Sequence, residues 1–380
     1  MKCDSFSRIT TAFERNVPDL MEAKEQGKKV VGQYCLYSPS EITLAAGAIP
    51  VSLCGTRNDS IPAAEEVLPR TLCPLIKSSY GFALQDSCPY LVASDIVVAD
   101  TTCDGKKKMF ELLAEYRPIV MLQLPQTQNV DALAYWRKQF EDLIARLEKE
   151  FGVNITDDKL RKAINVMNRE RLALKAVMDL AQRKPSAVTG MEMVELAFKT
   201  NFFPDKERGI AMMLDVAKEM GELADAGKST ISPDAPRILL TGVPVGMGSH
   251  KVVRLIEECG GSVVCLDNCS GYKRTRVMID ENAADPLTEL AKRYLDIPCA
   301  VMSPNPRRYE AITEMARDFS VDAVVDLTWQ GCQTYAVESY SLKKYVGETL
   351  KKPFLQLETD YSESDVEQLK VRIEAFLEML

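Results

Sequence analysis

Three cysteines stand out between residues 72 and 109, because Cys73, Cys88 and Cys103 follow one another with fourteen residues between successive members. The whole chain has 11 cysteines but only one histidine, His250. That composition excludes zinc sites built on two histidines, and most Cys-His or Ser-His-Asp schemes unless His250 itself serves. An odd number of thiols in a chain of 380 residues is not a small disulfide scaffold, so clustered cysteines indicate metal or redox chemistry.

Five cysteines follow runs of residues that read as buried strands, namely Cys35, Cys54, Cys103, Cys269 and Cys332. The carboxyl edge of an open parallel sheet is where ligands bind. Thiolate is a soft ligand, suited to zinc, copper(I) or iron–sulfur clusters. The chain has no Cys-x2-Cys pair and no bacterial ferredoxin run, so the pattern favours a metal cluster held by separate loops. Reduced, buried thiols are the alternative.

Other cysteines are expected to have structural roles. Cys259 and Cys265 fall in a helix and in mid-strand, where cysteine packs as a small apolar residue. Cys299 is placed at the start of a strand and is assigned to the core. Cys3, near the N-terminus, is given no role.

The residues after Cys103 add charge to the pattern. Cys103-Asp104-Gly105 is expected to begin a helix, whose backbone N–H groups would lower the pKa of the thiol. Of the three lysines at 106–108, at least two are expected to be solvated. One of them is a candidate to offset the negative charge of a cluster or substrate.

Apolar runs alternate with helical segments along two parts of the chain. In the first part we predict strands at 29–36, 49–54, 95–100 and 118–124, and Ser38 with Glu41 is expected to form a capping box for the helix between the first two. In the second part, strands are predicted at 237–244, 262–269, 297–304, 321–332 and 353–360. This alternation indicates parallel sheets covered by helices.

Three regions result from this pattern. They are an N-terminal α/β domain over 1–130, a helical insert over 131–228 and a C-terminal α/β domain over 229–380. A net charge of −8 argues against a nucleic-acid partner. No apolar run is long enough to span a bilayer, and the N-terminus does not resemble a signal peptide, so we expect a cytoplasmic protein.

The segment TGVPVGMGSHK (241–251) is neither a Walker A motif nor GxGxxG. A tight turn is the favoured interpretation, with an anion site at Gly246 and Gly248 as the alternative. His250 is expected at the surface beside this turn. The chain therefore shows no convincing ATP site of its own.

Five stretches together carry a family resemblance: GQYCLYSPSEITLAAGAIPVSLC, LPRTLCPLIKSSYGFALQDSCPY, VADTTCDGKKKMFELLAEYRP, LDNCSGYK and WQGCQTYAVES. The chain resembles the 2-hydroxyacyl-CoA dehydratase and benzoyl-CoA reductase superfamily from about residue 28 to its end, and within it the double-cubane cluster proteins. The resemblance implies two flavodoxin-like domains with a helical part. It also implies an iron–sulfur site between the domains.

By motif, the resemblance assigns Cys73, Cys103 and Cys332 to a [4Fe-4S] cubane. The double-cubane branch implies six ligands in one subunit, an [8Fe-9S] cluster, a homodimer, and electrons from a separate ATP-hydrolysing [4Fe-4S] activator. The other three ligands are predicted to be Cys35, Cys54 and Cys88, with Cys269 as the reserve.

Two activities follow from the resemblance. The first is reduction of a small molecule by a low-potential cluster, and the alternative is a 2-hydroxyacyl-CoA dehydratase subunit with a single [4Fe-4S] cluster. Glu41, Lys77 and Glu338 lie in the cysteine-bearing motifs and are candidates for acid–base roles. The capping role is preferred for Glu41.

Overall fold

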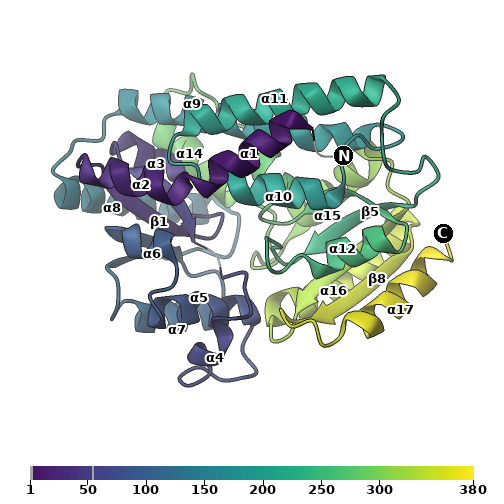
Figure 1. The fold of residues 1–380 in the computed structure, drawn as a ribbon. Coiled ribbons are helices and arrows are strands. Elements are labelled where there is room, and N and C mark those ends of the chain that lie inside the picture. Colours follow the sequence, from purple (N-terminus) through teal and green to yellow (C-terminus); the bar gives the residue numbers. More distant parts are fainter. Residues whose placement is uncertain (1–2, 54) are drawn as a thin grey trace.

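The computed structural model describes residues 3–53 and 55–380. The strands form two four-stranded sheets, and every strand pair in them is parallel. In Figure 1 the two sheets lie side by side, with β1 in the purple half of the chain and β5 and β8 in the green-to-yellow half. The predicted α/β class with two flavodoxin-like parallel sheets is confirmed.

Both sheets have the same strand order. The first is ordered β2-β1-β3-β4, with β1 (Val30–Tyr34), β2 (Ile49–Leu53), β3 (Ile96–Asp100) and β4 (Ile119–Leu122). The second is ordered β6-β5-β7-β8, with β5 (Arg237–Gly242), β6 (Ser262–Asp267), β7 (Ala323–Trp329) and β8 (Phe354–Thr359). The order reverses between β1 and β3 and between β5 and β7, and such switch points open a crevice at the carboxyl edge.

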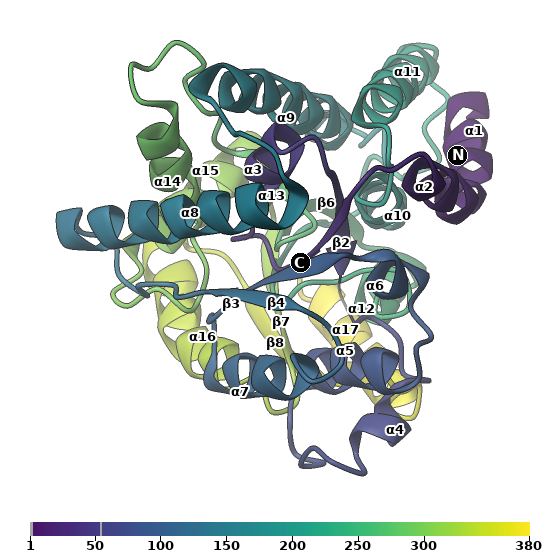
Figure 2. The same cartoon turned by 90° about the vertical axis from the view of Figure 1, so that its left-hand side faces the viewer.

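The inner strands are apolar runs because helices cover both of their faces. Every residue of β1, β3, β5, β6 and β7 is buried. The helices of the first unit are α3 (Ser40–Ala45), α4 (Ile61–Ala64), α5 (Pro74–Leu84), α6 (Pro89–Ala93) and α7 (Asp104–Leu113). Figure 2 shows α5 and α7 on one side of β3 and β4, and α3 on the other.

The second unit is covered in the same way. Its helices are α12 (Lys251–Glu258), α13 (Tyr272–Thr275), α14 (Pro286–Leu295), α15 (Pro306–Asp318), α16 (Gln333–Tyr345), a π-helical turn (Val346–Leu350) and α17 (Val366–Leu377).

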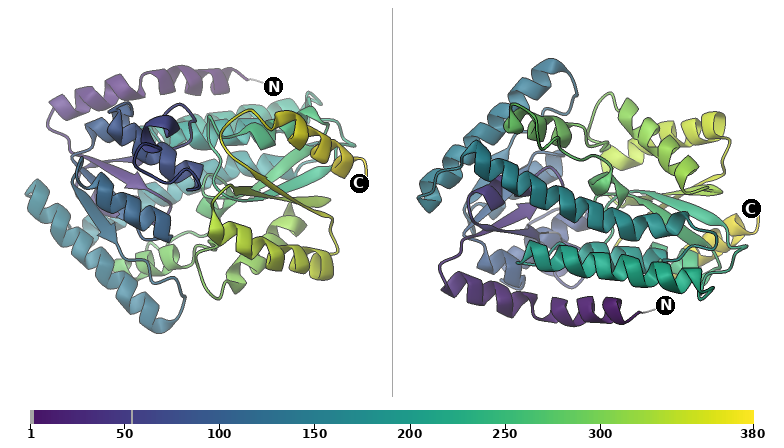
Figure 3. Two further views of the ribbon diagram at one scale, coloured as in Figure 1. Left: turned by 90° about the horizontal axis from the view of Figure 1, so that it is seen from below. Right: turned by 90° about the horizontal axis from the view of Figure 1, so that it is seen from above.

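A layer of helices joins the two sheet units. It consists of α1 (Asp4–Glu14), α2 (Asn16–Glu25), α8 (Val130–Phe151), α9 (Asp157–Asp179) with a 3-10 turn (Leu180–Gln182), α10 (Gly190–Thr200) and α11 (Lys206–Asp225). The helices α9 and α11 pack side by side (Figure 3), and α9 also contacts α3 of the first unit and α13 and α14 of the second. This layer therefore fixes the two sheets relative to each other. No helix among the described residues combines the length and apolar character needed to cross a membrane.

Two local predictions are wrong. Residues 297–304 form turns rather than a strand, because Pro298 and Pro304 flank the segment and cannot donate ladder hydrogen bonds. Ser38 does not cap α3 either: its hydroxyl donates to the carbonyl of Tyr34 at 2.9 Å. Glu41 is instead fully buried and paired with Arg171 of α9.

Candidate metal centre

A cavity of about 420 Å³ lies between the carboxyl ends of the two sheets. Residues that follow β1, β3, β5, β6 and β7 line it, so it spans both switch points. Six cysteines line the cavity: Cys35, Cys73, Cys103, Cys269, Cys299 and Cys332. Thiols from both halves of the chain therefore meet in one place.

Three of these cysteines stand at helix N-termini. Cys73 precedes α5, Cys103 precedes α7 and Cys332 precedes α16. None of these three side chains accepts a capping hydrogen bond, but the nearby backbone N–H groups of each helix act to lower the pKa of the thiol. Helix N-termini carry partial positive charge and favour anionic sulfur. At Cys103, however, burial outweighs the N–H groups and raises the pKa of the thiol, so the predicted lowering of that pKa is wrong.

The thiols of Cys73 and Cys332 are close enough to shift each other's pKa. Their interaction lowers the pKa of Cys73 and, together with burial, raises the pKa of Cys332. Gly331 permits this contact: its φ is 74°, and a Cβ there would lie 2.3 Å from the carbonyl oxygen of Thr71. Only glycine fits such a close approach of two backbones with that φ.

A second group consists of Cys35, Cys269 and Cys299. Burial raises the pKa of Cys35 well above its ordinary value, and Asp100 and the two other thiols of the group raise it further. Cys35 has a φ of 73°, in the left-handed region that non-glycine residues seldom adopt. Strain of this kind persists where surrounding structure holds it, often at functional sites. Cys299 is buried, with its sulfur 3.7 Å from the hydroxyl of Tyr335.

One lysine of the 106–108 run faces the cavity. Lys106 is buried, lines the cavity and lies 3.8 Å from the carboxylate of Asp100. Lys107 and Lys108 pair with Asp104 and Glu111 near the surface. The structure thus separates one buried cation from two solvated ones, as predicted from the sequence.

The structure does not bring Cys88 to this cavity. Helix α5 starts at the carboxyl edge of the first sheet and runs for 11 residues, about 16 Å, toward the opposite edge. Cys88 follows it and precedes α6, which leads into the amino end of β3. Cys54 lies outside the described residues. Cys265 is buried within β6, as expected of a core residue.

None of the three acid–base candidates lines the cavity. Glu41 pairs with Arg171 and accepts a hydrogen bond from Tyr294 at 2.8 Å. Lys77 donates to Glu65 at 2.7 Å. Glu338 lies 2.9 Å from Arg308 and accepts from Asn305 at 2.6 Å. Each of these charges therefore has a structural partner.

The donor set fits a cluster rather than a single ion. Within residues 3–53 and 55–380, no three His, Cys, Asp or Glu side chains converge as one metal ion would require. Thiolates that bind a cluster each ligate a different iron, so their sulfurs surround a volume instead of meeting at a point. Thiols without histidine ligands, at helix N-termini and beside a buried lysine, suit an anionic iron–sulfur group.

Cys299 is buried in the core, as the sequence predicts, but sequence reasoning missed that it also lines the cavity. The available signal was Pro298, because proline argues against a central strand and for a turn that can expose the next side chain. Tyr335, which contacts Cys299, was also missed. Its place in the first turn of α16, three residues after Cys332, is the signal for it.

The fold and this cavity define an α/β protein with a thiol-lined centre between two parallel sheets. Comparison with known proteins identifies the family: the model described as "HGD-D: 2-hydroxyglutaryl-CoA dehydratase, D-component" matches residues 35–380. The chain belongs to this family, which confirms the resemblance to the 2-hydroxyacyl-CoA dehydratase and benzoyl-CoA reductase superfamily.

Several relatives match most or nearly all of the chain. The "Putative dehydratase subunit YjiM" of Escherichia coli (strain K12) is 44% identical, over 99% of this chain and 97% of the relative. The (R)-phenyllactyl-CoA dehydratase beta subunit of Clostridium sporogenes is 26% identical, over 95% and 94%. One of the benzoyl-CoA reductase subunits from Thauera aromatica is 23% identical, over 71% and 69%.

Proposed function

We propose that this chain is an iron–sulfur oxidoreductase whose cavity holds an [8Fe-9S] double-cubane cluster. A separate ATP-hydrolysing [4Fe-4S] activator supplies low-potential electrons, and a small molecule is reduced. The observation that carries this proposal is that six cysteines, three from each half of the chain, line one cavity. When bound, the cluster supplies electron transfer at low potential.

The ligand assignment follows the two groups. Cys73, Cys103 and Cys332 hold one cubane, as the resemblance implies. Cys35, Cys269 and Cys299 hold the other, since they line the same cavity. Compared with the set predicted from the sequence, Cys269 and Cys299 take the places of Cys54 and Cys88. Cys88 lies at the other edge of the sheet, and Cys54 is kept as an alternative ligand. The role of the protein is to bury the cluster and to set its potential through backbone N–H groups and Lys106.

A separate activator is consistent with the 241–251 turn. A Cβ on Gly246 would lie 2.9 Å from the ring of Phe198 and 3.1 Å from Thr56, so side chains fill the space that a phosphate would need. His250 accepts a hydrogen bond from Gly248 within the same turn. The tight-turn interpretation of this segment is therefore preferred to an anion site.

A second candidate function is a subunit of a 2-hydroxyacyl-CoA dehydratase. It is favoured by the names of the relatives, which include alpha and beta subunits of the (R)-phenyllactyl-CoA enzyme. In this version Cys73, Cys103 and Cys332 hold a single [4Fe-4S] cluster, and a different subunit completes the enzyme.

Iron and sulfide analysis of protein purified without oxygen separates the two functions. The double-cubane cluster gives about eight irons per chain, and the single cubane gives about four. Cys299→Ser is expected to lower the iron content, whereas the matched variant Cys88→Ser is expected to retain it. Full iron content in Cys299→Ser together with a loss of iron in Cys88→Ser would contradict the ligand assignment. A loss of iron in Cys54→Ser would indicate that Cys54 is a cluster ligand.

Gel filtration of the chain expressed alone gives an independent test. A stable homodimer is expected for the double-cubane oxidoreductase. A monomer that assembles only with a different subunit favours the dehydratase.

A further inference from the structure

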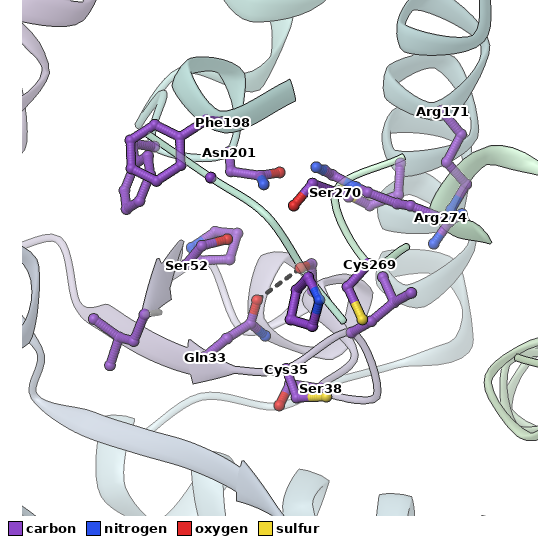
Figure 4. A pocket seen from close by; sticks show the side chains of 18 of the residues that line it. Gln33, Cys35, Ser38, Ser52, Arg171, Phe198, Asn201, Cys269, Ser270 and Arg274 are labelled. Atoms are coloured by element: carbon purple, nitrogen blue, oxygen red, sulfur yellow. Dashed lines mark hydrogen bonds between the residues drawn. The ribbon is translucent and has the colours of Figure 1, made fainter. Parts of the chain in front are cut away.

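A second pocket adjoins the cysteine cavity. It has a volume of about 110 Å³ and shares Cys35, Leu75, Pro244 and Cys269 with the larger cavity. In Figure 4 Cys35 and Cys269 lie close together on one side of this pocket, with Phe198 and Asn201 opposite them. The volume exceeds what a single water needs and suits a ligand of a few heavy atoms.

The charged residues that line the pocket are all cations: Arg171, Lys206, Arg274 and Arg293. Two carboxylates behind them provide partial compensation. Glu41 pairs with Arg171, and Glu170 accepts from Lys206 at 3.0 Å and from Arg274 at 2.6 Å. The pocket therefore has four positively charged residues and only two neighbouring carboxylates, so it carries an excess of positive charge.

Among residues 3–53 and 55–380, Arg293 has no ion pair with a carboxylate, and its guanidinium lies over the ring of Tyr294, 4.9 Å from the centroid. It is 5% exposed, and its Nη2 donates to the carbonyl of Arg274 at 2.6 Å. Its Nε and Nη1 are buried without a hydrogen-bond partner in the part of the chain that the structure describes. Burial, and then the neighbouring Arg171, lowers the pKa of Arg293 to about 10. Buried cations are normally paired, so these two donors point to a missing anion.

The rest of the wall combines polar side chains, among them Gln33, Ser52, Asn201 and Ser270, with an apolar patch. Phe198 and Phe202 line the pocket with ring centroids 5.0 Å apart, and Met167 and Leu53 also line it. A fitting ligand therefore has a negative end for the arginines and a short apolar part for the aromatic rings.

We propose that this pocket binds a small organic carboxylate, with its negative end at Arg293 and its apolar part against Phe198 and Phe202. The pocket volume of about 110 Å³ suits a small free acid better than a CoA conjugate. The ligand then lies beside Cys35 and Cys269, at the edge of the cysteine cavity. The binding of this ligand depends only on the pocket and does not rest on the proposed function.

Binding is tested on the full chain by calorimetric titration with sodium propionate at constant ionic strength. Propionamide, which has the same shape without the charge, is the ligand control. Propionate is expected to bind saturably and propionamide is not. Arg293→Gln is expected to weaken propionate binding by about tenfold or more, because a charge-assisted hydrogen bond is lost. The exposed Arg146→Gln on α8 is the matched variant and is expected to bind normally.

A second variant covers the case in which Arg293→Gln fails to fold. Asn201→Asp places a negative charge in the same pocket and is expected to weaken binding similarly. Equal binding of propionamide, equal binding of nitrate or sulfate, or normal propionate binding by both pocket variants would each overturn the proposal.

Iron content measured on the same anaerobic samples separates the two proposals. Propionate binding by protein that takes up no iron would reject the redox function and keep this site. Full iron content without propionate binding would reject this site alone.

Discussion

The thiols of Cys332 and Cys73 interact, and so link the N-terminus of α16 to that of α5. The two helices follow different sheets, so this contact closes the cysteine cavity across both halves of the molecule. The backbone of Gly331 against Thr71 sets the distance between the two loops.

Gly331→Ala is expected to push these loops apart. The added Cβ would meet a carbonyl oxygen at 2.3 Å and would require a left-handed φ, so the iron content of anaerobic protein should fall to about half or less. Gly347→Ala is the matched control, because a Cβ there meets nothing within 4 Å. Unchanged iron content in Gly331→Ala would contradict this prediction, because iron binding would then not depend on the distance between the two loops.

Lys106→Met is expected to make the proposed cluster harder to reduce. Removal of a buried positive charge beside the cavity disfavours the more negative, reduced form, by on the order of 50 mV or more. The exposed Lys108→Met should leave the potential unchanged. Electrochemical titration followed by electron paramagnetic resonance measures both, and a shift to higher potential in Lys106→Met would contradict the assigned role.

Glu41→Ala is expected to destabilise the fold by about 3–5 kcal/mol, because it leaves the buried cation Arg171 unpaired. Glu41→Gln should cost less, since an amide still accepts from Tyr294. Urea unfolding of the metal-free protein measures both changes. The exposed pair of Arg146 and Glu150 provides the comparison, where Glu150→Ala should change stability by less than about 1 kcal/mol.

Glu257 gives the fold a dependence on pH. Burial raises its pKa to about 7, and the nearby Glu192 adds to this, while the N–H groups of Gly190 and Met191 oppose it. The folded chain therefore holds a proton that the unfolded chain releases near its ordinary pKa of 4.5, so stability should fall as pH rises from about 4.5 to 7.

Glu257→Gln is expected to remove that slope, which amounts to about 3 kcal/mol at most. Denaturant melts at several pH values between 4 and 8 measure it. A slope that persists in the variant would assign the effect to other groups.

Much of the fold was predictable because buried parallel strands are short apolar runs bounded by turns. Residues 95–100 and 262–269 were predicted in this way and correspond to β3 and β6. The same reasoning failed at 297–304, where an apolar run is a turn held by the side chain of Asn305 on the carbonyl of Cys299. Pro298 and Pro304 are the local signal for this turn, and the apolar run between them led to the wrong prediction.

The site was predictable only in part, for a related reason. Strand ends mark the edge where Cys35 and Cys103 lie, but equal sequence spacing did not reveal that α5 carries Cys88 to the other edge. The arginines around the second pocket lie on separate helices, where each one reads as an ordinary solvated residue. Their convergence depends on how α9, α13 and α14 pack, which no single segment specifies.

The distribution of the cavity's cysteines along the chain has a consequence for biosynthesis. Cys35, Cys73 and Cys103 leave the ribosome early, whereas Cys269, Cys299 and Cys332 belong to the last third of the polypeptide. The nascent first half thus has no way to enclose these thiols on its own. Any cofactor delivered to this chamber must wait until translation is nearly complete.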